Sequence, residues 1–547
     1  IFYLTARGTT RTAAENALAI LRDTEPKLHL RSVTLTAKDR ICLCEARECT
    51  PEACPYANGY YARIKGALWD VLDVPCLTAE TLQEYAERHT VCPFELGLDS
   101  SLWSDVIIGD YNYLFDPVVH LVRFFESAGD YIFLVDEAHN LPGRAREMHS
   151  AALTKTSFYE AKKLLGKGKS SLKNALTKVN DVFIEWRHRA EEETAARDGR
   201  FGKTFFLKER SEEFDHLLNR LCEPLEAWLD DHREPDETHT ALLQLYFDVR
   251  AWLRVAATFD DHFVLQITAS GSEVRAAQLC LDPSAFLADS FALGRAAVLF
   301  SATLAPASYY KDLCGVPEAR AVALRSPFPA GNQGLCCNGN VSTRYKDRDA
   351  SLAIVEESLA TMVRARCGNY LAFFPSYAYM EQAYAQFKEH CPEINCIKQE
   401  NAMDEQQKAA FLAQFVPGPS QTLLGFAVMG GVFGEGVDLT GDRLIGVGIV
   451  GPGLPQVGPR QEQLRDYFEQ TRGSGFDYAY RYPGMNKVLQ AAGRVIRTPQ
   501  DKGVVLLIDN RFAMPDYRRL MPPHWSHLKM IYDTEKLERE LWRFWEE

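Results

Sequence analysis

The chain has 547 residues, more than a single hydrophobic core usually serves, so we expect three or four domains. Hydrophobic residues make up 46% and charged residues 25% of the sequence, as is typical of a globular protein. No window holds about 18 unbroken apolar residues, so we predict no membrane span. The formal net charge of −13 argues against a nucleic-acid partner, unless positive charge is confined to one channel.

The first hundred residues contain a strand, a helix and a cluster of cysteines. Ile1–Thr5 has the apolar character of a strand, and an Ala-rich segment of helical character follows it. Thirteen residues then hold four of the fourteen cysteines, and a fifth begins the sequence CPFE; these are Cys42, Cys44, Cys49, Cys54 and Cys92. Because most other cysteines are scattered singly, this grouping predicts metal ligation and not a disulfide framework.

The group expected at these cysteines is a [4Fe–4S] cluster, because four thiolates are its usual ligands. The predicted ligands are Cys42, Cys49, Cys54 and Cys92. Cys44 is the alternative to Cys42 as the first ligand. A structural zinc ion held by four cysteines is the competing interpretation.

A pair of acids follows a short apolar run. Asp105–Tyr113 reads as a strand with the loop beyond it, and Tyr131–Val135 is typical of a parallel strand buried on both faces. The sequence VDEAHN follows directly. Asp136 is predicted to act on a nucleotide through Mg²⁺, and Glu137 to orient the attacking water. An acidic turn that caps a helix is the alternative.

From about residue 150 to 290, Leu and Ala recur at helical spacing among many charges, which predicts a mostly helical insertion. Strand-like runs return after it and alternate with helical segments, as in two α/β domains. These runs are Ala296–Phe300, Tyr370–Phe374, Thr422–Ala427, Leu444–Val450 and Gly503–Asp509.

Three further motifs accompany these strands. Ser301–Leu304 (SATL) places hydroxyls at a strand end, where they also make good helix N-caps. Gly430–Asp438 (GGVFGEGVD) has glycines that allow close approach to a ligand, with Asp438 and Glu435 as polar contacts. Gln490–Arg497 (QAAGRVIR) has two arginines three residues apart, which predicts one helical face that reaches a γ-phosphate. A solvated helix face is the alternative for this last motif.

In this order, the motifs resemble those of superfamily 2 helicases of the DEAH type. A cysteine-rich insert before VDEAHN makes the chain similar to the XPD/DinG family of iron–sulfur DNA helicases, in its bacterial XPD-like branch. The resemblance spans nearly the whole chain and includes IFYLTARGTTRT, DYNYLFDP and FFPSY.

The resemblance implies an α/β fold with two RecA-like motor domains, and with a small cluster domain and a mostly helical arch domain inserted in the first. The expected boundaries are 1–38, 101–148 and 291–320 for the first motor domain, 39–100 for the cluster domain, 149–290 for the arch and 321–547 for the second motor domain. It also implies Mg²⁺-dependent ATP hydrolysis coupled to movement on single-stranded or forked DNA, 5′ to 3′. A cytoplasmic, monomeric protein without a membrane anchor fits this interpretation.

The family's motifs map onto this sequence residue by residue. The implied catalytic and nucleotide-binding residues are Asp136, Glu137, His139, Gly436, Asp438, Gln490, Arg494 and Arg497. The implied nucleic-acid contacts are Thr5, Arg7, Tyr111, Asn112, Ser376 and Tyr377. Ordinary packing is the alternative role for these contacts.

One family motif is missing: the phosphate-binding loop G-x-x-x-x-G-K-[ST] does not occur in the 547 residues. In the family this loop precedes the YLTARGTT segment, so we expect it upstream of Ile1, and we expect the chain alone to bind ATP poorly. Two other functions are possible. The first is a DNA-stimulated ATPase that remodels DNA complexes in repair or phage defence, and the second is a non-enzymatic DNA-binding protein.

Overall fold

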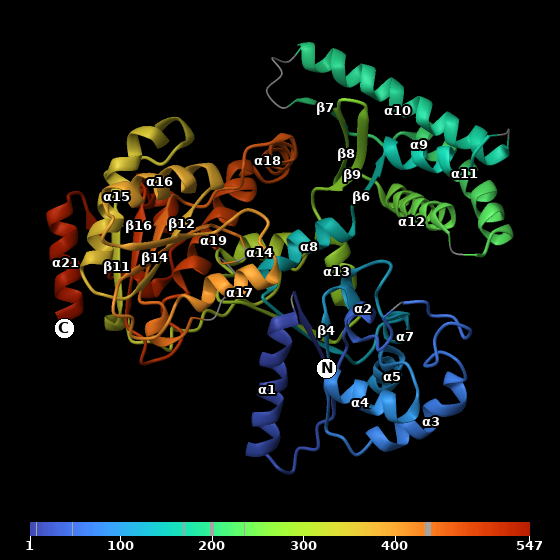
Figure 1. Cartoon of the computed structure of the whole chain (residues 1–547), viewed down its shortest axis with the longest axis horizontal. Helices are drawn as coiled ribbons and strands as arrows, with labels where there is room; N and C mark the ends of the chain where they lie inside the picture. Colours follow the sequence, from blue (N-terminus) through green and yellow to red (C-terminus); the bar gives the residue numbers. More distant parts are fainter. Residues whose placement is uncertain are drawn as a thin grey trace. The chain divides into compact units, whose positions relative to one another are not determined.

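The computed structural model describes residues 1–6, 8–45, 47–167, 170–196, 202–234, 236–431, 433 and 439–546. The chain forms two compact units, each of which is described separately below (Figure 1). The first unit comprises Ile1–Ser301 and Tyr310–Glu318. The second unit comprises Ala302–Tyr309 and Ala319–Glu547.

The first unit is built on a six-stranded sheet in which every pairing is parallel. In spatial order its strands are β10 (Ala296–Phe300), β5 (Ile132–Asp136), β1 (Phe2–Thr5), β4 (Val106–Asp110), β2 (Ser32–Thr34) and β3 (Cys76–Leu77). All strands point the same way, so their carboxyl ends meet at one edge, where the acids of VDEAHN lie.

Helices and the cysteine-rich segment surround this sheet. The helices are α1 (Gly8–Thr24), α2 (Lys38–Ile41), α3 (Tyr60–Val71), α4 (Ala79–His89), α5 (Pro93–Ser100), α6 (Asn112–Phe115), α7 (Val122–Phe125), α8 (Leu141–Met148) and α13 (Ser284–Ala292). The chain passes between the two units three times: after Ser301, within α14 (Ala307–Leu313) after Tyr309, and after Glu318.

Two predicted strands of this sheet are less covered than their apolar sequences suggest. β5 was expected to be buried on both faces, but Phe133 and Val135 are buried while Ile132 is 38% exposed. The expectation was therefore wrong for one face. β10 forms an edge of the sheet, and its Val298 is 51% exposed, although AAVLF has the composition of a covered parallel strand.

The insertion between β5 and β10 is helical as predicted, but it also contains an antiparallel sheet that the helical spacing did not predict. Its helices are α9 (Lys155–Leu164), α10 (Ser171–Ala196), α11 (Glu212–Asp231) and α12 (Glu237–Thr258). Its strands, in spatial order, are β6 (Ala151–Thr154), β9 (Glu273–Cys280), β8 (Phe263–Ser270) and β7 (Lys203–Leu207). In Figure 1, α10 crosses over this sheet, and a core of its own joins the sheet to the helices.

The second unit has a seven-stranded sheet, again parallel throughout. In spatial order its strands are β13 (Asn395–Lys398), β14 (Leu423–Val428), β12 (Asn369–Phe374), β15 (Gly446–Val450), β16 (Gly503–Ile508), β11 (Gln333–Asn338) and β17 (Lys529–Ile531). The strand-like runs predicted around residues 370, 422, 444 and 503 correspond to β12, β14, β15 and β16.

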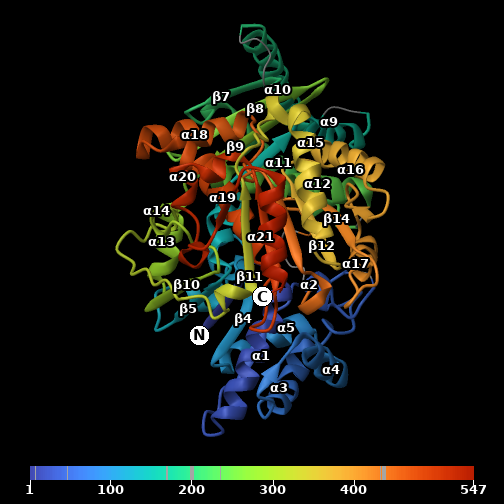
Figure 2. The same ribbon diagram turned by 90° about the vertical axis from the view of Figure 1, so that its left-hand side faces the viewer.

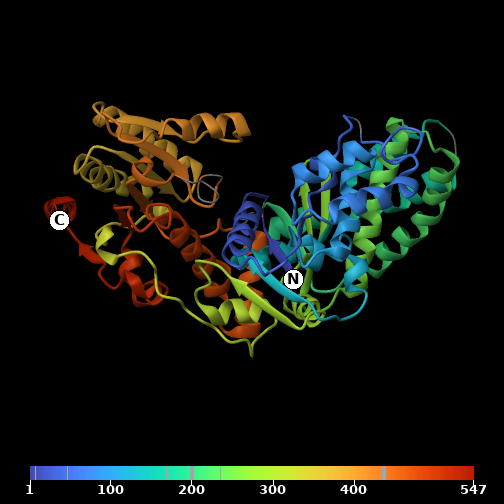
Figure 3. The ribbon, with the colours of Figure 1, turned by 90° about the horizontal axis from the view of Figure 1, so that it is seen from below.

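Helices cover both faces of this second sheet. They are α15 (Arg348–Arg364), α16 (Tyr377–His390), α17 (Glu405–Ala413), α18 (Pro459–Arg472), α19 (Tyr482–Ala492), α20 (Pro515–Arg518) and α21 (Thr534–Glu546). Figure 2 shows α21 running alongside β11, and Figure 3 shows the C-terminus at the rim of this unit. Along β12, Phe373 joins one hydrophobic core and Phe374 the other, because successive side chains of a strand point to opposite faces.

No helix in the described ranges is both long enough and apolar enough to cross a membrane.

Candidate active site

The first unit places a carboxylate at the end of a central strand. Asp136 is the last residue of β5, and one carboxylate oxygen accepts a 2.8 Å hydrogen bond from the backbone N–H of Glu137. The other oxygen accepts a 3.0 Å bond from the Tyr3 hydroxyl. Burial raises the pKa of Asp136, although these two hydrogen bonds oppose that effect. The carboxylate is thus fixed in orientation at the edge where nucleotides bind in parallel α/β sheets.

Glu137, His139 and Ser301 form a hydrogen-bonded group beside Asp136. The Ser301 hydroxyl donates to a Glu137 carboxylate oxygen at 3.1 Å, and Nδ1 of His139 lies 2.8 Å from the same hydroxyl. Nδ1 of His139 is also 3.2 Å from that Glu137 oxygen. The register explains the meeting: Phe300 of β10 pairs with Asp136 of β5, so Ser301 arrives next to Glu137. The sequence predicted each motif but not this contact.

Glu137 has an unusual backbone. Its φ is +49°, in the left-handed region that a residue with a Cβ rarely adopts. Such conformations persist where surrounding contacts hold them, and they concentrate at functional sites. The Glu137 side chain is 41% exposed while that of His139 is 4% exposed. The glutamate can therefore meet solvent or substrate, whereas the histidine acts as a buried support.

Thr5 and Tyr111 do not lie where a strand of nucleic acid could touch them. Both side chains are fully buried, and the Tyr111 hydroxyl donates a hydrogen bond to the backbone carbonyl of Asp136. The structure gives Tyr111 a supporting role under the acidic site, so the expected base contact is wrong for this arrangement. Asn112, by contrast, begins α6 and is partly exposed.

Several expected site residues lie outside the described part of the chain. They are Arg7, Glu435, Gly436 and Asp438. Of the contacts expected in the second unit, Ser376 is the N-cap of α16 and its hydroxyl accepts from the backbone of Tyr379. The Tyr377 hydroxyl accepts a 2.6 Å hydrogen bond from the Gln399 amide.

The two arginines of QAAGRVIR are not on one helical face, which corrects the expectation. α19 contains Gln490 but ends at Ala492, so Arg494 and Arg497 follow the helix in a turn and an extended segment. The chain leaves the helix because Val495 and Ile496 are buried in the core.

Asp501 then fixes the turn that follows. Its carboxylate accepts hydrogen bonds from the backbone of Arg497 at 2.7 Å and of Thr498 at 2.8 Å. The Arg497 side chain is exposed, and that of Arg494 is partly buried.

The clustered cysteines lie in loops around α2 and at the start of α5. The sulfurs of Cys44 and Cys54 are 3.9 Å apart. Burial, followed by the neighbouring thiols of Cys54 and Cys42, raises the pKa of Cys44 to about 11. Cys92 is the N-cap of α5, and burial raises the pKa of its thiol, although the backbone N–H groups of Glu95 and Phe94 oppose that effect. Among the described residues, no three Cys, His, Asp or Glu side chains are arranged as a preformed metal site.

The second unit contains a surface hollow that sequence reasoning missed. Its volume is about 400 Å³, and it is lined by Arg344, Tyr345, Leu454, Phe476, Arg481, Arg511, Met514 and Tyr517. Tyr345 is 86% exposed and Phe476 is 42% exposed. The lining residues come from well-separated segments, so no local spacing marks them. The sequence offered one signal, an arginine followed by an aromatic residue at Arg344–Tyr345.

A buried carboxylate holds this hollow together. Asp509 is fully buried and accepts hydrogen bonds from the backbone and hydroxyl of Thr343, at 2.9 and 2.5 Å. Arg511 binds the same carboxylate through Nε at 2.7 Å. The network therefore anchors Arg511 and the segment that carries Arg344 and Tyr345.

Two family models match this chain. The model DEAD_2 matches residues 17–158, and the model Helicase C-terminal domain matches residues 359–528. The Schizosaccharomyces pombe general transcription and DNA repair factor IIH helicase subunit XPD is 24% identical over 540 residues, covering 81% of this chain and 67% of the relative. The chain belongs to the XPD-like superfamily 2 helicases.

Other comparisons agree with this XPD-like assignment. The ATP-dependent DNA helicase CHL1 of Coccidioides immitis is 22% identical and covers 83% of this chain. The XPD-like chain spans 60% of the length of CHL1 and 67% of that of the S. pombe subunit. A solved structure titled XPD_Helicase aligns with 97% of this chain and 91% of its own, at 18% identity and a TM-score of 0.62. This likeness confirms the expected α/β fold with two RecA-like domains.

Proposed function

We propose that this XPD-like chain is the motor of an ATP-dependent DNA helicase that moves 5′ to 3′ on single-stranded DNA. The observation that supports this most is the joining of Asp136, Glu137, His139 and Ser301 at the carboxyl ends of β5 and β10. The residues that follow the two neighbouring strands β5 and β10 thereby form one acidic site. The similarity to relatives that are named as helicases supports the same function.

The acidic site suits hydrolysis of a nucleoside triphosphate. Asp136 would hold Mg²⁺, which neutralises charge on the phosphates when it is bound. Glu137 accepts a proton from the attacking water and orients it, since its carboxylate is exposed and held by Ser301. Tyr3 keeps the Asp136 carboxylate in position through its hydroxyl.

The arginines of the second unit complete the proposed reaction. Arg494 and Arg497 stabilise the charge that develops on the γ-phosphate, with Gln490 and Asp438 as further polar contacts to the nucleotide and water. The turn fixed by Asp501 limits the freedom of this segment, which favours a defined position for Arg497.

A phosphate-binding loop from outside these 547 residues is part of this proposal. The exposed apolar edge of β10 supports it, since Val298 would be covered if a further parallel strand paired with β10. Such a strand would end beside Ser301, at the edge of the sheet that carries Asp136 and Glu137.

The hollow of the second unit is the proposed contact for single-stranded DNA. Arginines bind phosphates, and the exposed rings of Tyr345 and Phe476 offer stacking faces to bases. Arg481 pairs with Asp477 and Asp516, and Arg511 pairs with Asp509. Among the described residues of this hollow, Arg344 is therefore the arginine without a carboxylate partner. Asn112, Ser376 and Tyr377 remain proposed contacts.

The clustered thiols suit an iron–sulfur cluster chemically. Burial raises the pKa of Cys92, but the backbone N–H groups of Glu95 and Phe94 and the nearby Lys38 ammonium oppose this rise, and Lys38 also lies near Cys49. Cys42, Cys49, Cys54 and Cys92 would hold the cluster, which supplies a rigid cross-link between these loops when it is bound. The 3.9 Å separation of the Cys44 and Cys54 sulfurs keeps Cys44 as the alternative to Cys42.

Iron content tests this assignment. Anaerobically purified protein should carry about four iron atoms and absorb visible light. Cys92→Ser and Cys42→Ser should each lower the iron to background, whereas Cys44→Ser and the control Cys76→Ser, at a cysteine outside the group, should retain it. Bound zinc without visible absorbance would replace the cluster by a structural zinc site, and loss of iron in Cys44→Ser alone would make Cys44 the first ligand.

Strand separation tests the motor. Protein that includes the residues preceding Ile1 should hydrolyse ATP when single-stranded DNA is added and unwind a duplex with a 5′ tail but not one with a 3′ tail. Residues 1–547 alone should show little of either activity. DNA-stimulated hydrolysis without unwinding would favour the remodelling ATPase, and DNA binding without hydrolysis would favour a non-enzymatic protein. Full ATPase activity of the 547 residues would overturn the proposed upstream loop.

A further inference from the structure

The helical insertion has one strongly basic end. Between residues 155 and 178 the sequence contains seven lysines and a single acidic residue, Glu160, although the whole chain carries a net charge of −13. Six of them lie on α9, on α10 or, for Lys167, between the two helices, and Lys169 is outside the described residues. Lys163, Lys167 and Lys178 are exposed, and none of the three forms an ion pair within the described residues.

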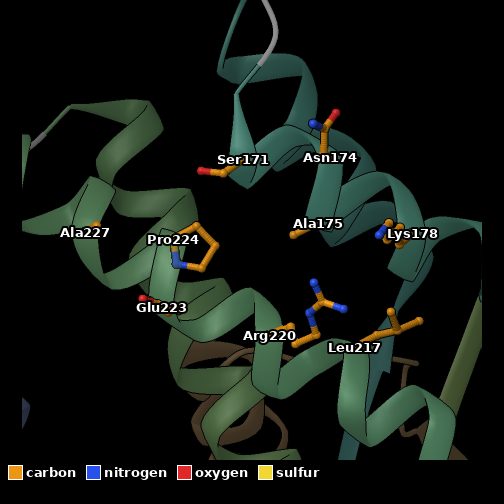
Figure 4. Close-up of a pocket in the computed structure, with 9 residues that line it drawn as sticks. All are labelled: Ser171, Asn174, Ala175, Lys178, Leu217, Arg220, Glu223, Pro224 and Ala227. Atoms are coloured by element: carbon orange, nitrogen blue, oxygen red, sulfur yellow. The ribbon is translucent and has the colours of Figure 1, made fainter.

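A hollow of about 500 Å³ opens at this end, between α10 and α11 (Figure 4). Its lining comprises Ser171, Asn174, Ala175 and Lys178 of α10, and Leu217, Arg220, Glu223, Pro224 and Ala227 of α11. In Figure 4 the Arg220 side chain extends from α11 toward α10. Arg220, like Lys178, has no ion pair in the described ranges.

The sequence explains why the two helices leave space here. Ala175 and Ala227 are small, so little side-chain volume fills the gap between α10 and α11. Pro224 lies inside α11 and has no N–H, so the carbonyl of Arg220, four residues earlier, loses its helical donor. The hollow therefore presents hydroxyl, amide, ammonium and guanidinium donors. Glu223 is the single acid in its lining.

This composition favours an extended anion. Four of the nine lining side chains are donors, and two of these, Lys178 and Arg220, carry positive charge. The exposed Lys163, at the end of α9, and Lys167, in the connection to α10, add further positive charge to this part of the insertion. Lysines that are not fixed by carboxylates suit phosphodiester groups, which they contact as mobile point charges. No aromatic side chain lines the hollow, whereas protein interfaces usually use aromatic anchors.

We propose that this basic end, defined by Lys163, Lys167, Lys178 and Arg220 with the hollow between α10 and α11, is a second binding site for the phosphodiester backbone of nucleic acid. It lies in the insertion, away from Asp136 and Glu137, and its binding needs no ATP. The site goes beyond the proposed motor function, because none of its residues belongs to the acidic site or to the hollow of the second unit.

Salt-dependent binding without ATP tests this site. The variant Lys163→Gln/Lys167→Gln/Lys178→Gln/Arg220→Gln is compared with Lys27→Gln/Lys65→Gln/Lys208→Gln/Arg233→Gln, which removes four exposed cations elsewhere. Fluorescence anisotropy follows labelled duplex, single-stranded DNA and poly-glutamate over a salt series. We expect the first variant to reduce the salt slope by about 3.6 for duplex and about 2.8 for single strands, since each of the four phosphate contacts contributes about 0.9 and about 0.7 respectively.

The outcomes separate the ligand sources. A reduced slope for duplex alone, for single strands alone, or for both supports the site and names the form of nucleic acid that it holds. An equal loss of poly-glutamate binding would assign the surface to an acidic protein partner and overturn the proposal, as would an unchanged slope. Replacing the three lysines by arginine should preserve the slope. Basal ATP hydrolysis should stay unchanged in the first variant, so failure of this site is distinguishable from failure of the motor.

Discussion

Replacing Glu137 by glutamine is expected to slow DNA-stimulated ATP hydrolysis by about 10²–10⁴-fold, the usual contribution of a general base. Glutamine has nearly the same shape, so the hydrogen bond from the Ser301 hydroxyl can persist. The amide cannot take a proton from water, however. Nucleotide binding should therefore remain within a few-fold of the original while turnover is lost. Steady-state ATPase assays with a fluorescent-nucleotide titration measure the two effects separately.

Glu147 provides a matched control for this experiment. It lies on α8 shortly after the same motif, its side chain is 62% exposed, and it forms an ion pair with Arg144 at 3.3 Å. Because exposed ion pairs contribute little, Glu147→Gln should change hydrolysis by less than about twofold. Under the proposed function, both proteins are assayed together with the proposed phosphate-binding loop. If Glu137→Gln kept more than a tenth of the activity, another group would have to act as the base.

Most of the predictable part of the fold followed from two sequence features, namely the apolar runs and the residues at their ends. A run such as Ala296–Phe300 has the length of a strand, and alternation with helical segments specifies a parallel sheet. The positions of Asp136 and Glu137 followed from the end of the run before them. The contact of Glu137 with Ser301 did not follow, because it depends on β10 pairing with β5 across 164 residues of sequence, in a register that only the structure gives.

The features that the sequence did not predict share a physical cause. The spacing of residues along the chain does not show which side chains the folded protein buries. Arg494 and Arg497 have helical spacing, but α19 ends at Ala492, and Val495 and Ile496 between the two arginines are buried in the core. Tyr111 has the residue type of a base-stacking contact, yet it is fully buried beneath Asp136. The antiparallel sheet of the insertion was masked by the stronger helical periodicity of its neighbours.

The hollow of the second unit could not be predicted from the sequence for the same reason. Its arginines come from three places in the sequence, and what brings two of them together is a buried acid, Asp509. A single aspartate after a strand carries no local sign of that role. This surface depends on hydrogen bonds between residues that are far apart in the sequence, and composition does not reveal such bonds.

Asp509→Asn is expected to lower the free energy of unfolding of the second unit by about 3–5 kcal/mol, the cost of breaking one partner of a buried pair. The substitution removes the charge that faces Arg511 and turns an amide toward the N–H and hydroxyl donors of Thr343. Amide hydrogen exchange in residues 341–347 and 503–511 reports this loss directly. Asp442→Asn, at an exposed aspartate, is the matched control and should change stability by less than about 0.5 kcal/mol.

The pH dependence of stability provides a second test of the role of Asp509. Burial opposes ionisation of Asp509, but the hydrogen bonds and the charge of Arg511 outweigh it and hold its pKa below the ordinary 3.8. A lowered folded-state pKa means that the stabilisation is present above the unfolded-state value and is lost as the pH falls through the lower, folded-state value. The original protein should therefore lose this contribution below about pH 4, whereas Asp509→Asn has none to lose. Parallel acid unfolding curves for the two proteins would show that Asp509 does not carry the charge interaction, and the anchoring of Arg511 and Tyr345 would need another explanation.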